Sequence, residues 1–276
     1  MKLITALATP FENGKIHLES YNRLLATQRD ADELLVVGTT AEGALLSNTE
    51  KKLLIETAKT AQTKKVWVGI GGATAEAVKE AKQAKKCGAD GLLISPPAFY
   101  KCTETGYVRH VAEILDATSL PIMLYNAPSR CGYTIWQNAM ETLAKMGVEY
   151  LKDAGSEPAY AAKTSLTIYC GNEEKLQEFA NSGAKGVVSV VSNAMPTLVK
   201  QAGEYAESRQ WQQEGANAYE VFLKLAHLAF CEINPIPIKY ILYRLGIFST
   251  YELRLPLTPA SEKTRAKIDE FLENLI

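Results

Sequence analysis

The sequence predicts an α/β protein in which eight parallel strands close into a (β/α)8 TIM barrel, with a C-terminal helical extension. Short apolar runs alternate with longer amphipathic segments, as in repeated strand–helix units. The short runs are apolar throughout, which is typical of strands that are covered on both faces. The length of 276 residues suits one such barrel. An open doubly wound sheet is the alternative, because periodicity does not establish closure.

The predicted strands are short and rich in valine, leucine and isoleucine, as buried parallel strands are. They cover residues 3–8, 34–37, 66–70, 91–95, 122–125, 150–152, 167–170 and 186–190.

The predicted helices lie between the strands and begin or end at recognisable signals. Ser47 or Asn48 is suited to cap the second helix, and Gly88, Gly147 and Gly183 follow the ends of three others. The helices of the barrel cover residues 18–29, 49–60, 75–87, 106–116, 135–146, 157–163, 173–182 and 196–207.

The pattern changes after about Ser208, where helical segments follow one another without further strands. These segments cover residues 210–230, 236–245 and 260–275. We therefore expect residues 1–207 to form the catalytic barrel and residues 208–276 to form a C-terminal helical extension packed on it.

Composition excludes several classes of function. The net charge of −1 offers no basic field for nucleic acid or an anionic membrane. The five cysteines and three histidines are scattered, without the spacing of a disulfide framework or a zinc site. The apolar start of the chain is better explained as a first strand than as a signal peptide. We expect a cytoplasmic protein without a metal or an organic cofactor.

Chemistry in such a barrel is expected where strands end and loops begin. Lys152 ends the sixth strand, and burial there favours the neutral, nucleophilic amine; the alternative is a lysine that reaches solvent or pairs with Asp153. Tyr125 ends the fifth strand and offers a phenol for proton transfer, although a structural tyrosine is the commoner case. Thr39 and Thr40 lie in a glycine-flanked turn suited to a small carboxylate, or in an ordinary turn.

Arg130, in the loop after the fifth strand, could hold a second carboxylate, although most loop arginines are simply solvated. Other catalytic motifs are missing. Residues 69–74 are not a G-x-G-x-x-G fingerprint, and the chain contains neither a Walker A motif nor a G-x-S-x-G elbow.

Together these residues resemble the dihydrodipicolinate synthase/N-acetylneuraminate lyase family of class I aldolases. The resemblance rests on Gly-Thr-Thr-Ala-Glu at 38–42, Tyr-Asn-Ala-Pro-Ser-Arg at 125–130, Leu-Lys-Asp at 151–153, Gly-Val-Val-Ser-Val at 186–190 and Asn-Pro-Ile-Pro-Ile-Lys at 234–239. Each block is weak alone, but their joint occurrence in this order along nearly the whole chain is specific.

The resemblance implies a role for each matching residue. Lys152 would form an imine with pyruvate, and Tyr125 would transfer protons with help from Thr39. Thr39 and Thr40 would bind the pyruvate carboxylate. The remaining substrate contacts would come from the Val188 carbonyl, Gly171 and Arg130.

Arg130 and the block at 234–239 favour the synthase branch, which condenses pyruvate with L-aspartate 4-semialdehyde in the diaminopimelate route to lysine. The alternatives are a pyruvate-dependent aldolase for a sugar acid, such as 2-keto-3-deoxygluconate, and a non-catalytic paralogue that binds a ketoacid. The family also implies a homotetramer built as a dimer of dimers.

The chain departs from the family pattern in two loops. Ala41 stands where glycine is usual. After the fourth strand, Phe99 occupies the place of a tyrosine that enters a neighbouring subunit's proton relay, so Tyr100 is the candidate replacement; otherwise Tyr125 and Thr39 would work with water. The family's lysine-feedback site is also altered, with only Glu76 retained. The positions matching its other contacts hold Gly43, Asn48, Lys51, Gly72 and Ala98.

Overall fold

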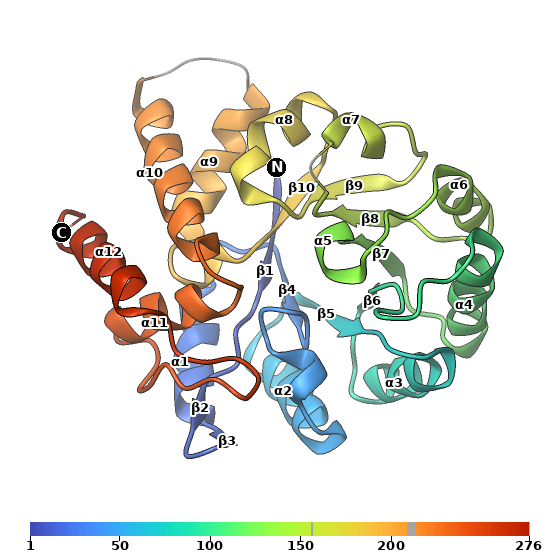
Figure 1. The fold of residues 1–276 in the computed structure, drawn as a ribbon, viewed down its shortest axis with the longest axis horizontal. Helices are drawn as coiled ribbons and strands as arrows, with labels where there is room; N and C mark the ends of the chain where they lie inside the picture. The colour runs from blue at the N-terminus through green and yellow to red at the C-terminus, as the bar shows by residue number, and fades with distance from the viewer. Residues whose placement is uncertain (156, 209–212, 276) are drawn as a thin grey trace.

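The computed structural model describes residues 1–155, 157–208 and 213–275. Its main sheet is a closed parallel barrel (Figure 1). The barrel strands are β1 (Lys2–Ala6), β4 (Glu33–Val36), β5 (Lys65–Ile70), β6 (Gly91–Ile94), β7 (Ile122–Asn126), β8 (Tyr150–Asp153), β9 (Thr167–Cys170) and β10 (Gly186–Ser189). Because β1 pairs with both β10 and β4, the sheet has no free edge. The TIM-barrel prediction is confirmed, and an open doubly wound sheet is excluded.

The helices surround the barrel at the places the sequence predicts. They are α1 (Leu18–Thr27), α2 (Asn48–Ala61), α3 (Thr74–Lys86), α4 (Glu104–Ala117), α6 (Gln137–Lys145), α7 (Pro158–Ala161), α8 (Leu176–Asn181) and α9 (Pro196–Ser208). Ser47, rather than Asn48, caps α2, in a reciprocal capping box with Glu50. Gly88, Gly147 and Gly183 all have positive φ, as residues that end helices do.

The structure adds two short elements that were not predicted and divides one predicted helix. A short hairpin, β2 (Phe11–Glu12) and β3 (Lys15–Ile16), follows β1 and turns through Asn13 and Gly14, both with positive φ. A one-turn helix, α5 (Pro128–Cys131), follows β7. The predicted helix at 173–182 is divided into a 3₁₀ turn (Glu173–Lys175) and α8.

The barrel interior is closed at the end where the strands begin. Trp67 donates a 2.6 Å hydrogen bond from Nε1 to Glu33, which also pairs with Lys2. Gly91 makes room for the Trp67 ring, because a β-carbon there would lie 2.4 Å from it. The opposite end, where the strands finish, is therefore the one available for a site.

Three further helices, α10 (Gln213–Phe230), α11 (Ile236–Arg244) and α12 (Glu262–Glu273), lie together on one flank of the barrel (Figure 1). Residues 210–212 of the predicted helix at 210–230 lie outside the described residues. The connection between α11 and α12 reaches across α1 towards α2, where the Arg254 guanidinium pairs with Glu50. Within the described residues, no helix is both long and apolar enough to cross a bilayer.

Candidate active site

A cavity of about 860 Å³ opens where the barrel strands end. Its lining includes five of the residues predicted from the sequence: Thr39, Thr40, Tyr125, Arg130 and Lys152. They come from the loop after β4, from β7 and the helix that follows it, and from β8. The closed barrel thus brings together residues that are far apart in the sequence, at the end of the fold where barrel enzymes hold their chemistry.

Lys152 and Tyr125 are neighbours on two adjacent strands. The register of β7 and β8 places them side by side, and the Lys152 Nζ lies 4.5 Å from the centre of the Tyr125 ring. Both side chains are buried, with exposed fractions of 7% and 8%. From the sequence, Lys152 was expected to face the barrel mouth, with exposure to solvent or a pair with Asp153 as the alternatives. In the structure the side chain lines the cavity, beside the Tyr125 ring.

Asp153 points to the other face of β8, since successive side chains of a strand alternate. Its Oδ1 accepts hydrogen bonds of 2.8 Å from the Asn126 amide and from the Gly155 N–H. Asn126 in turn accepts from the Ile135 N–H at 3.1 Å. These bonds join the ends of β7 and β8 behind Tyr125 and Lys152 and fix their relative positions.

Glu173 is a buried acid near Lys152 that no sequence motif singles out. It accepts hydrogen bonds from the Ser189 hydroxyl at 2.5 Å and from the Val190 N–H at 2.7 Å. Burial raises the pKa of its carboxyl, while these donors and the positive charge of Lys152 oppose the rise. An acidic residue three positions after the end of β9 was the signal available in the sequence.

Gly171 lies directly beside the catalytic candidate Lys152. A β-carbon at Gly171 would approach Lys152 Cε to 2.9 Å. Val188, on β10, is buried in the same inner cluster as Tyr125. Gly171 therefore contacts the Lys152 side chain and Val188 lies in the barrel interior, but neither residue is among those that line the cavity.

The loop after β4, residues 38–43, forms a compact turn. The Ala41 and Gly43 N–H groups both donate to the Gly38 carbonyl. Gly43 allows this closure, since a β-carbon there would lie 2.0 Å from the Val37 carbonyl oxygen. Thr39 is half-buried and Thr40 is buried. We refer to these residues as the 38–43 turn.

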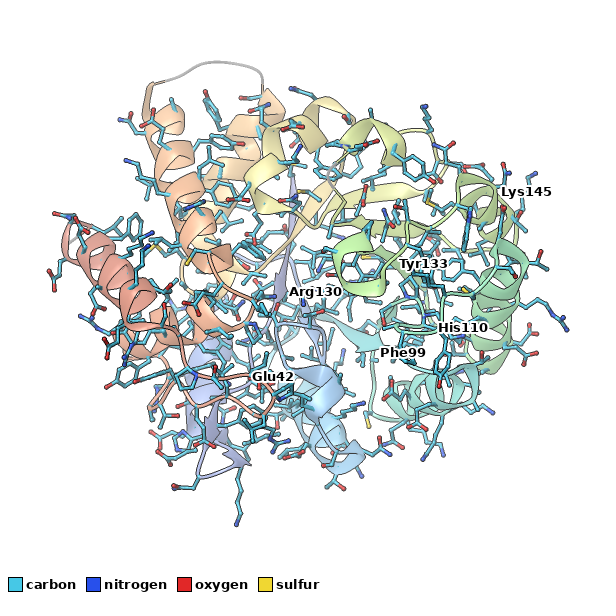
Figure 2. The ribbon with its side chains drawn as sticks, in the orientation of Figure 1. Glu42, Phe99, His110, Arg130, Tyr133 and Lys145 are labelled. Atoms are coloured by element: carbon cyan, nitrogen blue, oxygen red, sulfur yellow. The ribbon has the colours of Figure 1, made fainter. Side chains whose placement is uncertain are left out.

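Arg130 lies on α5, a short helix that begins at Pro128, ends at Cys131 and is capped by Gly132, which has a φ of 78°. The pre-set φ of proline at the first helical position favours such a start. Figure 2 shows Arg130 over the middle of the barrel, and its exposed side chain also lines the cavity. It is available to a second anionic group at the mouth.

Phe99 and Tyr100 project from the loop after β6. Their exposed fractions are 89% and 77%, and the two rings meet edge to face at 5.1 Å. From the same loop Ala98, which carries no hydroxyl, lines the cavity. Figure 2 shows Phe99 beside α3 and α4, to one side of Arg130. To take part in the reaction, either aromatic ring would have to reach the cavity of another copy of the chain, or the loop would have to change its conformation.

The fold and these groups define a lyase of the Schiff-base aldolase class: a barrel with a buried lysine beside a phenol at its mouth. The profile of the Dihydrodipicolinate synthetase family matches residues 1–275. The chain belongs to this family.

Relatives agree with this assignment over nearly the full length. The 4-hydroxy-tetrahydrodipicolinate synthase of Rickettsia bellii (strain OSU 85-389) is 37% identical, covering 99% of this chain and 96% of its own. The crystal structure of dihydrodipicolinate synthase from Aquifex aeolicus has a TM-score of 0.93 at 32% identity, covering 99% and 97% of the two chains. The enzyme from Acinetobacter baumannii, complexed with pyruvate, has a TM-score of 0.92 at 29% identity, covering 99% and 98%.

Proposed function

We propose that this chain condenses pyruvate with L-aspartate 4-semialdehyde, as a 4-hydroxy-tetrahydrodipicolinate synthase of the diaminopimelate route to lysine. The observation that carries the proposal is the buried Lys152 amine, 4.5 Å from the Tyr125 ring, in the wall of a cavity that also contains Thr39, Thr40 and Arg130. The names of the relatives support the same reaction.

The reaction begins on the neutral Lys152 amine, which attacks the C2 carbonyl of pyruvate. Water leaves and an imine forms, with Tyr125 and the Thr39 hydroxyl moving the protons. The protonated imine then accepts electrons as a methyl proton is lost, which gives an enamine. Splitting a difficult deprotonation into imine and enamine steps is what covalent catalysis by an amine achieves.

The enamine carbon attacks the aldehyde carbon of the second substrate and forms the new C–C bond. The amino nitrogen of the second substrate then attacks the imine carbon, which closes the ring and breaks the bond to Lys152, so that the product leaves and the free amine is restored. Thr40 and the 38–43 turn would bind the pyruvate carboxylate, and Arg130 would hold the carboxylate of the aldehyde substrate through its planar fork. Val188 and Gly171 would border the bound ketoacid.

We also propose a cytoplasmic homotetramer, arranged as a dimer of dimers, because a relay hydroxyl from Tyr100 would have to come from a neighbouring copy. In this proposal residues 1–207 are the catalytic barrel and residues 208–276 are the extension that braces it. Size-exclusion chromatography with light scattering measures the assembly directly.

The test of the function is reduction by borohydride in the presence of pyruvate, followed by peptide mass mapping. We expect a reduced pyruvyl group on the peptide containing Lys152 and none in the Lys152→Arg variant, since a guanidinium forms no imine. An adduct elsewhere, or none, would remove Lys152 from its role. Rates with L-aspartate 4-semialdehyde and with sugar aldehydes separate the synthase from a sugar-acid aldolase. Pyruvate binding without turnover of any aldehyde would indicate a non-catalytic paralogue.

A further inference from the structure

A fully buried ion pair links the C-terminal helices to the 38–43 turn. Lys239, on α11, donates a 2.6 Å hydrogen bond from Nζ to the Glu42 carboxylate, and neither side chain is exposed to solvent. The Lys239 ammonium also lies 4.3 Å from the centre of the Phe11 ring. Burying two charges is costly unless their geometry is good and their remaining polar atoms are satisfied. The free-energy cost of burying this pair must therefore be offset by the contacts around it, which makes those contacts worth following.

Glu42 acts on the backbone that carries Thr39 and Thr40. It adopts a left-handed conformation with a φ of 55°, which a non-glycine residue adopts at a cost. Its own N–H donates to the Thr39 carbonyl at 3.0 Å. Its carboxylate also accepts from the Arg254 backbone N–H at 2.9 Å, so two segments of the extension hold it. The strained residue that closes the turn is thus fixed from outside the turn.

A second contact from the same region reaches the turn directly. Asn234, just before α11, donates from Nδ2 to the Thr40 hydroxyl oxygen at 3.1 Å. Asn234 and Thr40 are both buried, and both line the cavity. From the other side of the turn, the Thr9 hydroxyl donates to the Ala41 carbonyl at 2.8 Å. These bonds leave Thr39 and Thr40 little freedom to move.

We propose that Lys239 and Asn234 are positioning residues for the ketoacid carboxylate, acting through Glu42 and Thr40 on the shape of the 38–43 turn. This inference rests on the proposed function, in which the turn binds the carboxylate of pyruvate. Preorganised donors bind an anion without the cost of ordering them first. Loosening the turn therefore weakens the binding of pyruvate, while the amine and the phenol stay in place on β8 and β7.

The test compares the variants Lys239→Met, Lys239→Met/Glu42→Gln and Asn234→Ala with the wild type in steady-state assays. We expect KM for pyruvate to rise at least tenfold in Lys239→Met and in the double variant, and about threefold in Asn234→Ala. The value of kcat should stay within threefold of wild type in all three variants. The reason is that a contact made equally in the ground state and the transition state changes KM alone. KM for L-aspartate 4-semialdehyde, which Arg130 would hold, should stay within twofold. A general loss of structure would instead raise both KM values and lower kcat.

If Lys239→Met does not fold, the double variant Lys239→Met/Glu42→Gln is used for the test, because it leaves no unpaired buried charge. Lys2→Met is the matched control: Lys2 pairs with Glu33 at 2.6 Å at the closed end of the barrel, and its loss should leave both KM values unchanged. An unchanged KM for pyruvate in folded double and Asn234→Ala variants would overturn the inference.

Borohydride trapping of the wild type separates this outcome from a failure of the proposed function. A wild-type adduct on Lys152 means that the function stands, and the pyruvate concentration giving half-maximal trapping should rise in the variants as KM does. If the wild type forms no adduct, the function itself fails, and the inference that rests on it falls as well.

Discussion

Lys152 packs so closely over Gly171 that no β-carbon fits between them. A β-carbon on Gly171 would lie 2.9 Å from Lys152 Cε and 3.0 Å from Lys152 Cγ. Gly171 is held there because its N–H donates a 2.7 Å hydrogen bond to the Asp153 carbonyl, on the strand that carries the lysine. Glycine at position 171 thus sets the path of the amine into the cavity.

Gly171→Ala is therefore expected to displace the Lys152 side chain and slow imine formation at least tenfold, because small errors in placing a reacting group are costly. The rate of borohydride trapping with pyruvate measures this step. Gly203→Ala is the control, since a β-carbon on that helical glycine meets only Met1, at 3.4 Å. A Gly171→Ala protein that traps pyruvate at the wild-type rate would show that the lysine can take another path.

Asn126→Ala should destabilise the protein by about 1–3 kcal/mol, because it leaves a buried N–H without its partner and a buried carboxylate with one donor fewer. The affected groups are Asp153 Oδ1 and the Ile135 N–H. Urea unfolding gives the change in the free energy of unfolding. Asn138→Ala, at an exposed position on α6, should change it by less than about 0.5 kcal/mol.

Tyr100→Phe tests whether the exposed phenol supplies the relay that Phe99 cannot. We expect kcat to fall by about tenfold or more, since a positioned proton donor contributes about 10²–10⁴ to rate. Phe99→Leu should leave kcat nearly unchanged, because no hydroxyl is lost. The assembly state of each variant must match the wild type. An undiminished kcat in Tyr100→Phe would leave proton transfer to Tyr125, Thr39 and water.

L-lysine should inhibit weakly or not at all. The six residues that replace or retain the family's feedback contacts all line the cavity: Gly43, Asn48, Lys51, Gly72, Glu76 and Ala98. Apart from Glu76 and Lys51, their side chains are small or uncharged and offer a cationic amino acid little to bind. Lys51 pairs with Glu80, so its repulsion is weaker than its charge alone implies. A steady-state inhibition constant below 1 mM would contradict the prediction, and a competing 2-oxoacid serves as the positive control.

The Arg254–Glu50 pair should make stability depend on pH in the acid range. The Arg254 hydrogen bond is the largest cause that lowers the pKa of Glu50, from 4.5 to about 2. A lowered carboxyl pKa contributes stability that is complete above pH 4.5 and is lost as the pH falls towards 2.

Glu50→Gln should therefore cost about 1 kcal/mol at pH 7, a modest value for a partly exposed pair. The difference in melting temperature from wild type should shrink between pH 4.5 and pH 3. Glu113→Gln, exposed on α4, should show neither effect. If the melting temperature of Glu50→Gln lay below that of the wild type by the same amount from pH 7 to pH 3, the charge of Glu50 would not be what stabilises the fold.

The barrel strands could be predicted to within about two residues because each is a short apolar run that must be buried on both faces. The β2–β3 hairpin was missed because two-residue strands are too short to show alternation, although Asn13 and Gly14 carry a turn signal. The one-turn helix α5 was missed for the same reason of length, despite Pro128 at its start.

Candidate site residues were found from their place after strands and from the blocks they share with a known family. The meeting of five of them around one cavity required closure of the barrel, which no local pattern encodes. Glu173 was overlooked because its importance depends on the Ser189 and Val190 groups that face it only in the folded chain. The pairing of Lys239 with Glu42 likewise joins residues 197 positions apart.

That long separation bears on synthesis of the chain. When residue 208 leaves the ribosome, every barrel strand has already been made, yet neither Asn234 nor Lys239 has emerged to meet Thr40 and Glu42. Contacts of such high sequence separation form late, because a long loop must close before they are gained. A nascent chain can thus hold a complete ring of strands before one wall of its pocket has taken its final shape.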